Sequence, residues 1–509
     1  MKLFKIRGGV HPKGRKELAS EAPVTPVFIP DFLRVPLQQH IGAPADPIVA
    51  KGDLVKKGQL LASGQGMISA PVHAPTSGKV TKIGQYPAPH PSGLPGRTIT
   101  IKPDGLDEWG EGLEPMDPET AKPADIAARV AECGIVGMGG ATFPSSVKLN
   151  LGKRYDLHTL VINGAECEPY LTCDDRLMRD FTKEVCDGIS IMRKTLEVKR
   201  AIIAIEKNKP QALAAMKEAA KEFEGLRVVG VPVQYPMGSE KHLVQTLTGL
   251  ETPARGLTAD IGVVVHNAAT AKAVRDAIRL GRPLISRLVT LSGGAMKNPG
   301  TYDVLIGTTI EDLLAHAGGT TEEAERMILG GPMMGQPITQ MRAPLVKGSN
   351  GVLALTAAES KPKTSTACIR CATCVSVCPC GLMPLEMAAR IKKEQLDAAV
   401  DVGLMDCVAC GSCSFACPSS IPLVQYFNYA KGKLTETQRA KHKTEETKRL
   451  AEARNVRMER IAKEKKEAMA RKKAARAAQK KKEAEAKKAA EASGEASATE
   501  PTVEKQVSA

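Results

Sequence analysis

The sequence is poor in aromatic residues and has a single tryptophan in 509 residues. Aromatic side chains make up 3% of the chain, whereas 42% of all residues are hydrophobic, so aliphatic side chains must supply most of the core. No stretch approaches the 18 consecutive apolar residues that indicate a transmembrane helix. Residues 1–16 also lack the apolar segment of a secretion signal. We therefore expect a cytosolic chain without a transmembrane segment of its own.

A recognisable catalytic constellation is also missing. The chain has nine histidines, yet no Ser/His/Asp arrangement and no cysteine in the setting of a nucleophile can be identified. These absences argue against a hydrolase, and we expect no side chain to act as a catalytic acid, base or nucleophile.

The positive charge is concentrated at one end. The formal net charge is +15, and residues 431–509 account for +10 of it. This Ala/Lys-rich segment has almost no residues that build a core, so it predicts a helical or disordered basic tail. Its alternative role is an electrostatic contact with anionic lipid or an acidic partner. Because no aromatic residues interleave the lysines to stack on bases, we expect no nucleic-acid partner.

Eight of the thirteen cysteines form two copies of one spacing, C-x2-C-x2-C-x3-C-P. This is the ligand pattern of two [4Fe–4S] clusters. In two-cluster ferredoxins the fourth cysteine of each run serves the other cluster. We therefore expect one cluster to be bound by Cys368, Cys371, Cys374 and Cys417, and the other by Cys407, Cys410, Cys413 and Cys378.

Zinc is the alternative for these cysteines, since paired Cys-x2-Cys also builds zinc ribbons. A zinc site needs four thiolates, however, and gives no reason for runs that end in Cys-Pro. A disulfide framework is disfavoured in a long chain of a reducing compartment. Cys380, two residues after Cys378, is not needed as a ligand, and we interpret it as a spare thiol beside a cluster.

Residues 1–112 alternate short β-like runs with Gly and Pro turns, which predicts a small β-domain. Two of the runs, residues 49–59 and 72–80, resemble the barrel-sandwich fold of biotinyl and lipoyl carrier domains. A carrier presents a lysine at the hairpin tip, whereas residues 65–69 here read Gln-Gly-Met-Ile-Ser. We expect the carrier shape without a carried prosthetic group.

Residues 113–285 alternate strand-like and helix-like segments, as in an α/β domain with a largely parallel sheet. A Gly-rich loop at residues 134–144 would let backbone N–H groups approach a phosphate closely. Three further polar runs follow predicted strands, at residues 161–169, 238–242 and 264–267. Open α/β sheets bind ligands at such strand ends.

Together these four runs resemble the flavin- and NADH-binding subunit of respiratory complex I. The shared motifs are a GxGGAGFP loop, an Asn…Glu-x-Glu-Pro loop, a Gly-x-Glu turn and a Val-Val-x-Asn strand end. They cover Gly137, Gly139, Gly140, Phe143, Lys148, Asn163, Glu166, Glu168, Gly238, Glu240 and Asn267. Val136 and Met138 stand where the complex I loop usually carries arginines.

The resemblance implies a role for each of these groups. The Gly-rich loop and Lys148 would face FMN phosphate or NADH. The two asparagines would hold the flavin, and Phe143 would stack on nicotinamide or adenine. Glu166 and Glu240 would line the nucleotide pocket.

Residues 286–340 predict strand, turn, strand and helix, and they resemble the SLBB β-grasp module that accompanies the same flavin domain in complex I. Residues 341–430 then hold the two-cluster ferredoxin motif. The predicted fold class is multidomain α/β plus α+β. It comprises a barrel-sandwich β-domain, a Rossmann-like FMN/NADH domain, an SLBB β-grasp module, a two-cluster [4Fe–4S] ferredoxin domain and a helical or disordered basic tail.

This order of domains resembles the RnfC (RsxC) family, the peripheral subunits of the Rnf ion-translocating electron transport complexes. The resemblance implies an NADH:ferredoxin oxidoreductase-type translocase subunit at the cytoplasmic side of the bacterial inner membrane. Electrons would pass between NADH and ferredoxin through FMN and the clusters, coupled to Na⁺ or H⁺ movement. The partners would be the other Rnf/Rsx subunits and a ferredoxin or ferredoxin-like subunit. The alternative is a ferredoxin-like electron-transfer adaptor without nucleotide binding.

Overall fold

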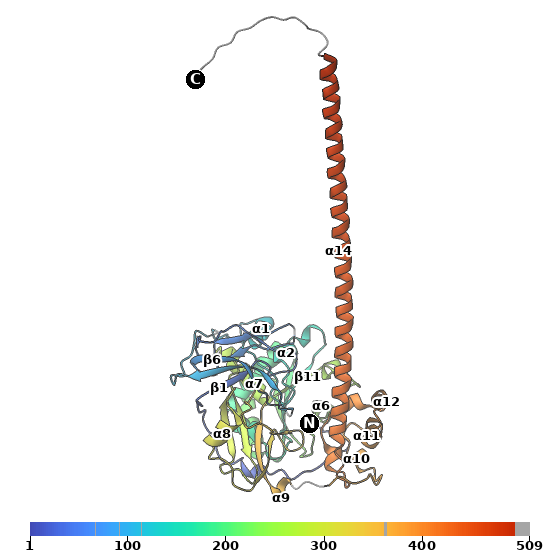
Figure 1. The fold of residues 1–509 in the computed structure, drawn as a ribbon. Coiled ribbons are helices and arrows are strands. Elements are labelled where there is room, and N and C mark those ends of the chain that lie inside the picture. The colour runs from blue at the N-terminus through green and yellow to red at the C-terminus, as the bar shows by residue number, and fades with distance from the viewer. Residues whose placement is uncertain (67, 91, 113, 361–363, 494–509) are drawn as a thin grey trace. The chain divides into compact units, whose positions relative to one another are not determined.

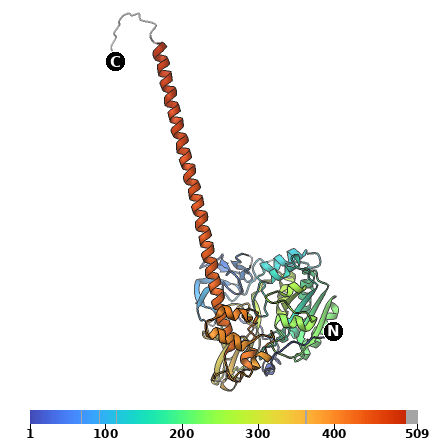
Figure 2. The same cartoon turned by 90° about the vertical axis from the view of Figure 1, so that its right-hand side faces the viewer.

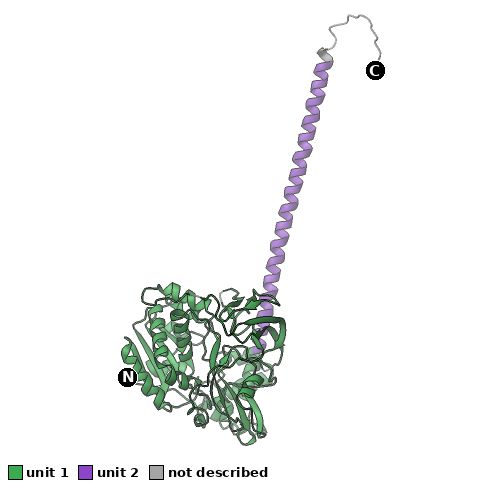
Figure 3. Ribbon diagram, turned by 90° about the vertical axis from the view of Figure 1, so that its left-hand side faces the viewer, with its two compact units in different colours: residues 1–431 green, residues 432–509 purple. Residues whose placement is uncertain are grey.

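The computed structural model describes residues 1–66, 68–90, 92–112, 114–360 and 364–493. The chain divides into two compact units, residues 1–431 and residues from 432 onward (Figures 1 and 3). The second unit begins one residue after the predicted start of the basic tail. The predicted hairpin-tip residue Met67 lies outside the described residues.

The N-terminal β-domain is a sandwich of two antiparallel sheets, ordered β1-β7-β6-β3 and β2-β4-β5. Its core is aliphatic and alternates along the strands: Leu33 and Val35 of β1 are fully buried on either side of Arg34. η1 (Lys16–Leu18) precedes this domain, whose elements are β1 (Leu33–Pro36), β2 (Asp46–Pro47), β3 (Leu54–Val55), β4 (Leu60–Ser63), β5 (Val72–His73), β6 (Gly78–Pro87) and β7 (Pro95–Pro103).

The residues before β1 contact the α/β domain that follows, although the sequence predicts one β-domain from residue 1. The backbone N–H of Phe4 donates to Thr246 O at 2.9 Å, and Val10 pairs with Tyr235 as an antiparallel bridge. The N-terminus accordingly lies beside α6 (Figure 1). The first 20 residues therefore extend the α/β domain that follows.

That α/β domain is built on a parallel four-stranded sheet, ordered β10-β9-β8-β11. Its elements are α1 (Pro123–Glu132), α2 (Ser145–Leu149), η2 (Leu151–Lys153), β8 (Thr159–Gly164), α3 (Cys173–Asp180), α4 (Thr182–Thr195), β9 (Arg200–Glu206), α5 (Pro210–Ala219), η3 (Ala220–Glu222), β10 (Leu226–Val231), α6 (Glu240–Thr248), η4 (Thr258–Ile261), β11 (Val263–Asn267) and α7 (Ala268–Arg279).

Both faces of this sheet are buried, which explains why its strands are almost continuously apolar. Leu160 and Ile162 point into a core shared with α1, α4, α5 and α7, whereas Val161 points toward α6 and the N-terminal segment. The chain adds β9 on one side of β8 and later returns to add β11 on the other. The gap between β8 and β11 is thus the topological switch point, where open α/β sheets bind ligands.

The next module has a five-stranded sheet, ordered β13-β12-β16-β14-β15, with α8 packed on it. The elements are β12 (Ser286–Ser292), β13 (Gly300–Leu305), α8 (Ile310–His316), β14 (Ala324–Leu329), β15 (Gln336–Pro337), β16 (Gly351–Thr356) and α9 (Ala357–Ser360). β16 lies between β12 and β14, so residues 351–356 complete this sheet.

The cysteine-rich region is mostly loops and short helices. Its elements are α10 (Thr373–Ser376), α11 (Pro384–Lys392), α12 (Leu396–Asp401), η5 (Leu404–Asp406), α13 (Ser412–Phe415) and the start of α14 (Leu423–Ser493). α14 is one unbroken helix (Figure 2). From residue 441 to residue 490 its side chains are exposed except at Ile461, as expected for a segment that cannot build a core.

Candidate functional site

A cavity of the first unit, about 1260 Å³, opens at the switch point of the parallel sheet. Its lining includes all eleven predicted nucleotide-site residues: Gly137, Gly139, Gly140, Phe143, Lys148, Asn163, Glu166, Glu168, Gly238, Glu240 and Asn267. The sequence placed this site in the α/β domain alone. The walls also include residues 36–41, 44, 88–90, 92 and 94–98 of the β-sandwich, residues 329–331 and 334–336 of the β-grasp module, and Val408 and Cys410 of the cysteine-rich region.

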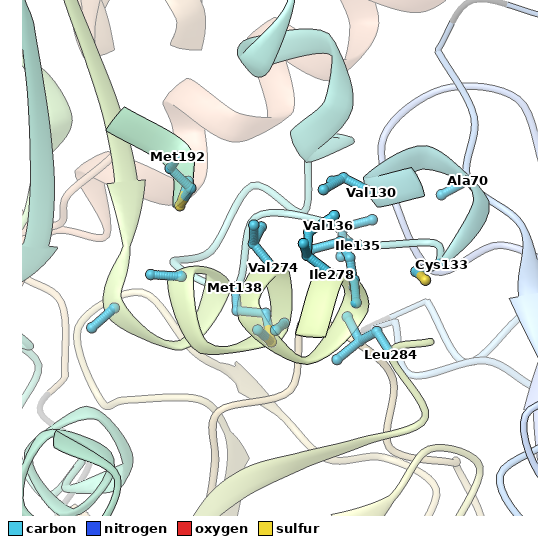
Figure 4. Close-up of a cluster of buried hydrophobic side chains, with 14 of the residues drawn as sticks. Ala70, Val130, Cys133, Ile135, Val136, Met138, Met192, Val274, Ile278 and Leu284 are labelled. Atoms are coloured by element: carbon cyan, nitrogen blue, oxygen red, sulfur yellow. The ribbon is translucent and has the colours of Figure 1, made fainter. Parts of the chain in front are cut away.

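The Gly-rich loop lines this cavity with Gly137, Gly139 and Gly140 and also with Phe143. Val136 and Met138 are buried among Val274 and Ile278 of α7 (Figure 4). A Cβ on Gly140 would meet no atom within 4 Å, and this residue has φ +128°. The loop therefore leaves room beside its backbone at Gly140 for a bound group.

Two asparagines stand opposite each other at the carboxyl ends of the central strands. Asn163 of β8 pairs in register with Asn267 of β11. Asn163 Nδ2 donates to Gly238 O at 2.8 Å, and Asn267 Nδ2 donates to the Asp174 carboxylate at 2.6 Å. Asn267 Oδ1 also caps α7 by accepting from Ala269 N. These contacts fix both amides at the cavity wall.

A salt bridge crosses another part of the cavity. Lys148 Nζ lies 3.1 Å from Glu240 Oε2 and also donates to Val265 O at 3.0 Å. Thr258 Oγ1 donates to the second Glu240 oxygen at 2.8 Å. The Glu240 side chain remains 43% exposed, so an entering ligand can reach it.

Glu166 and Glu168 line the cavity and also hold neighbouring segments of the chain in place by accepting backbone hydrogen bonds. Glu166 accepts from the N–H groups of Asp174 at 2.6 Å and Asp175 at 3.3 Å, at the start of α3. Glu168 accepts from Met333 N at 3.0 Å and Met334 N at 2.9 Å, and so ties the α/β domain to the β-grasp module. Burial raises the pKa of each carboxyl to about 7.

Sequence reasoning missed the residues that hold the loop carrying these acids. Lys16 Nζ donates to the carbonyls of Glu166 at 2.9 Å and Glu168 at 3.0 Å. Lys209 Nζ donates to Ala165 O at 2.6 Å. Lys16 lies 150 residues before its partner, and no local pattern reveals such a contact.

His266 was also missed, although it stands in a run that the sequence singled out. It lines the cavity, and its Nε2 has no hydrogen-bond partner within the described part of the chain. Burial lowers the pKa of His266 well below its usual value, so the ring is neutral. A buried ring nitrogen without a hydrogen-bond partner is expected where a bound ligand supplies the missing hydrogen bond.

A second, smaller cavity is lined by four of the predicted cluster cysteines, Cys378, Cys407, Cys410 and Cys413. They come from both copies of the motif, as the crossed pattern requires. Burial, together with the neighbouring Cys407, Cys410 and Cys378, raises the pKa of Cys413 to about 12. Cys380 lines the same cavity, and its nearby thiol lowers the pKa of Cys378 to about 6.

The other four cysteines lie nearer the surface. Cys368 and Cys371 are exposed, and Cys374 and Cys417 are half-buried. Burial raises the pKa of Cys374, and Cys417 and Cys368 raise it further by their proximity. Cys374 thus neighbours a cysteine of the other copy.

The buried cysteine group adjoins the large cavity. Val408 and Cys410 line both cavities. Tyr235, which lines the large cavity, donates from its phenol to Cys410 O at 2.6 Å. The residues that would hold a nucleotide and those that would hold a cluster therefore share a wall.

Four family models match the chain in the predicted order. They are the RnfC barrel sandwich hybrid domain over residues 4–106, the Nuo51 FMN-binding domain over residues 130–276, the SLBB domain over residues 288–337 and the 4Fe-4S dicluster domain over residues 367–421. The predicted fold class is confirmed. Among the residues described, no helix is long and apolar enough to cross a membrane.

Three bacterial relatives match the chain over most of its length. The C subunit of the ion-translocating oxidoreductase complex of Rhodobacter capsulatus is 57% identical over 443 residues, which is 87% of this chain and 85% of the relative. The C subunit of the proton-translocating ferredoxin:NAD(+) oxidoreductase complex of Clostridium ljungdahlii is 43% identical over 84% of this chain and 94% of the relative. The corresponding ion-translocating oxidoreductase protein of Pseudomonas aeruginosa is 41% identical over 90% of this chain and 59% of the relative.

Proposed function

This chain belongs to the RnfC family, the C subunits of ion-translocating oxidoreductase complexes, and we propose that it carries electrons between NADH and ferredoxin in an Rnf-type complex. This proposal rests on the wall that the two cavities share, which Val408 and Cys410 form. A nucleotide site and a metal cluster that share a wall are suited to electron exchange.

The large cavity fits FMN. The Gly-rich loop leaves open space at Gly140, Lys148 supplies a cation for phosphate, and Asn163 and Asn267 present amides at the switch point. His266 offers a ring nitrogen that has no partner in the described chain. FMN, when bound, would divide the electron pair that NADH delivers as hydride, and the clusters would each carry one electron at a time.

NADH would enter the same cavity. Glu240 is exposed and held by Lys148 and Thr258, which suits it to accept hydrogen bonds from a ribose or an amide of the substrate. Phe143 lines the cavity with a half-exposed ring and would stack on the nicotinamide or adenine. Glu166 and Glu168 would act by fixing the loop between β8 and α3 and its neighbour in the β-grasp module.

The cysteines would hold two [4Fe–4S] clusters in the crossed pattern. Cys378, Cys407, Cys410 and Cys413 would bind the buried cluster next to the nucleotide cavity. Cys368, Cys371, Cys374 and Cys417 would bind the cluster at the surface. Electrons would then pass between the nucleotide and the buried cluster at one end of the route. At the other end they would pass between the exposed cluster, near Cys368 and Cys371, and a ferredoxin-like partner docked there.

The ion movement must belong to other subunits, and we place this subunit at the cytoplasmic side of the bacterial inner membrane, bound to the rest of an Rnf/Rsx complex. The coupling would use Na⁺ or H⁺. The basic residues from 432 onward would favour an anionic lipid or protein surface by electrostatics.

The rival function is a ferredoxin-like adaptor that passes electrons without binding a nucleotide. The two functions differ in flavin content and in the response to NADH. Anaerobic purification followed by flavin and iron analysis separates them: the proposal requires FMN and about eight iron atoms per chain. Iron without flavin, and clusters that NADH leaves oxidised, would support the adaptor.

A further inference from the structure

The β-sandwich forms a wall of the nucleotide cavity, although none of the residues that we assign to FMN or NADH belongs to it. This wall includes residues 36–41, where β1 ends, and residues 94–98, where β7 begins. Within the sheet, Pro36 of β1 pairs with Thr98, and Gln85 of β6 pairs with Arg97. One end of the antiparallel sheet therefore faces the cavity.

The cavity exceeds the usual volume of a site for one small ligand. It measures about 1260 Å³, whereas such sites usually have about 300–1,000 Å³. Asn163 and Asn267 stand at the switch point in the α/β domain, so a flavin held there leaves the wall of the β-sandwich to a second ligand. NADH must place its nicotinamide near the flavin to deliver hydride. The rest of the molecule, including its pyrophosphate, then extends along the remaining walls.

A pyrophosphate needs positive charge, and the cavity offers little. The described lining residues with a formal charge are Glu166, Glu168, Asp174, Glu240, Lys148 and Arg97. Lys148 is already paired with Glu240 at 3.1 Å. Arg97 is therefore the one cation of the described lining that no lining acid neutralises.

Arg97 can turn to a ligand at little cost. Its Nη1 lies 4.0 Å from Asp46 Oδ1, and the two side chains are 55% and 63% exposed. Such an exposed ion pair contributes little to stability. The planar guanidinium holds several N–H donors in a fixed arrangement that matches the oxygens of a phosphate. A pyrophosphate can therefore take the place of Asp46.

We propose that the β-sandwich belongs to the NADH site and that Arg97 binds the pyrophosphate of the dinucleotide. The inference rests on the proposed role of this cavity as the site of FMN and NADH. It gives a role in substrate binding to a domain that resembles a carrier without a carried group. The two cations of the cavity then serve different ligands. Lys148, which donates to Val265 O at the switch point, faces the flavin phosphate, and Arg97 faces NADH.

The test is calorimetric binding of ADP-ribose to the full-length, anaerobically purified protein and to three variants. ADP-ribose carries the pyrophosphate without the nicotinamide, so its binding requires no electron transfer. We expect Arg97→Ala to weaken the affinity at least about tenfold, because a lost hydrogen bond to a charged group has an effect of this size. Arg97→Lys keeps the charge and should lose less. Lys102 is exposed on the same strand outside the cavity lining, so Lys102→Ala should bind as the wild type does.

A second measurement compares two hydride donors in the same variants. Reduced nicotinamide riboside has the nicotinamide of NADH but no phosphate. Arg97→Ala should lower kcat/KM for reduction by NADH at least about tenfold and leave the value for the riboside unchanged. Flavin content, iron content and melting temperature should equal those of the wild type.

Wild-type affinity for ADP-ribose in Arg97→Ala would overturn the inference and leave the electron-entry function intact. A lower flavin content in this variant would also overturn it, because Arg97 would then hold the FMN phosphate. An equal loss of kcat/KM with NADH and with the riboside would overturn it too, since the defect would not depend on phosphate. A wild type that carries FMN but binds neither ADP-ribose nor NADH would contradict the proposed NADH site and the inference with it.

Discussion

The phenol of Tyr235 donates a hydrogen bond of 2.6 Å to the backbone carbonyl of Cys410. Tyr235 lines the nucleotide cavity, and Cys410 lines both this cavity and the buried cysteine cavity. Because the side chain of Tyr235 is almost fully buried, the bond is shielded from water and fixes the cluster loop against the wall of the nucleotide site.

Replacement of Tyr235 by Phe should lower the free energy of unfolding by about 1–3 kcal/mol, because the buried carbonyl of Cys410 loses its donor. Chemical denaturation of the anaerobic protein measures the change. Tyr155→Phe is the matched control, since its phenol has no hydrogen-bond partner in the described part of the chain. Equal stability of the two variants would show that the Tyr235 bond does not hold the cluster loop.

Replacement of Glu240 by Gln should slow NADH-driven reduction at least about tenfold, since one lost hydrogen bond to a charged group is worth on the order of 1.5–3 kcal/mol. Flavin and iron contents should not change, and stability should change by less than about 1 kcal/mol because the ion pair with Lys148 is partly exposed. Stopped-flow absorbance measures the rate. Glu218→Gln, which breaks an exposed Lys–Glu pair outside the cavity, is the control. Unchanged kinetics in Glu240→Gln would remove this residue from the NADH site.

The crossed ligand pattern predicts which cysteine variants share a phenotype. Cys374→Ser and Cys417→Ser should disturb the same exposed cluster, although 43 residues separate them in the sequence. Cys378→Ser should disturb the buried cluster instead. EPR spectra and iron analysis of the three variants, with Cys186→Ala as a buried non-ligand control, make the comparison. If Cys374→Ser and Cys378→Ser disturbed the same cluster, the crossed pattern would be contradicted, and each run of four cysteines would bind a cluster of its own.

Much of this site could be predicted from the sequence because its parts are local motifs. Four of the cysteines that the spacing predicted as ligands line one small cavity, and all eleven predicted nucleotide-site residues line one larger cavity. Glycine and asparagine residues at strand ends can be assigned to the site from the sequence, because the backbone conformation fixes where they lie.

Contacts between distant segments could not be predicted in this way. Lys16 supports a loop 150 residues away, and Glu168 reaches the N–H groups of Met333 and Met334 in another module. β16 joins the β-grasp sheet between β12 and β14 after a long connection. Such contacts depend on how modules pack, which no local period or motif encodes.

The raised pKa of Glu168 predicts a pH dependence of stability. Burial raises the pKa of Glu168 from 4.5 to about 7. The protonated carboxyl therefore makes its full contribution to the free energy of unfolding below pH 4.5, and this contribution is lost as the pH rises to 7. The loss is on the order of 3 kcal/mol. Glu168→Gln cannot ionise and should show a weaker fall of stability between pH 4.5 and 7. Denaturation across this range measures it, and an unchanged slope would show that Glu168 titrates normally.

Removal of residues 441–509 should leave the melting temperature, iron content and flavin content unchanged. The side chains of residues 441–490 are exposed except at Ile461, so their loss removes little buried apolar surface. Differential scanning calorimetry of the shortened and full-length chains gives the comparison. A melting temperature lower by several degrees would mean that the tail stabilises the first unit.

The most direct test of electron entry is an anaerobic titration of the purified chain with NADH, followed by absorbance and EPR, after flavin and iron have been quantified. We predict FMN, about eight iron atoms per chain, bleaching of the flavin absorbance and a reduced-cluster EPR signal. Clusters without flavin, and spectra that NADH does not change, would contradict it and leave the adaptor function in its place.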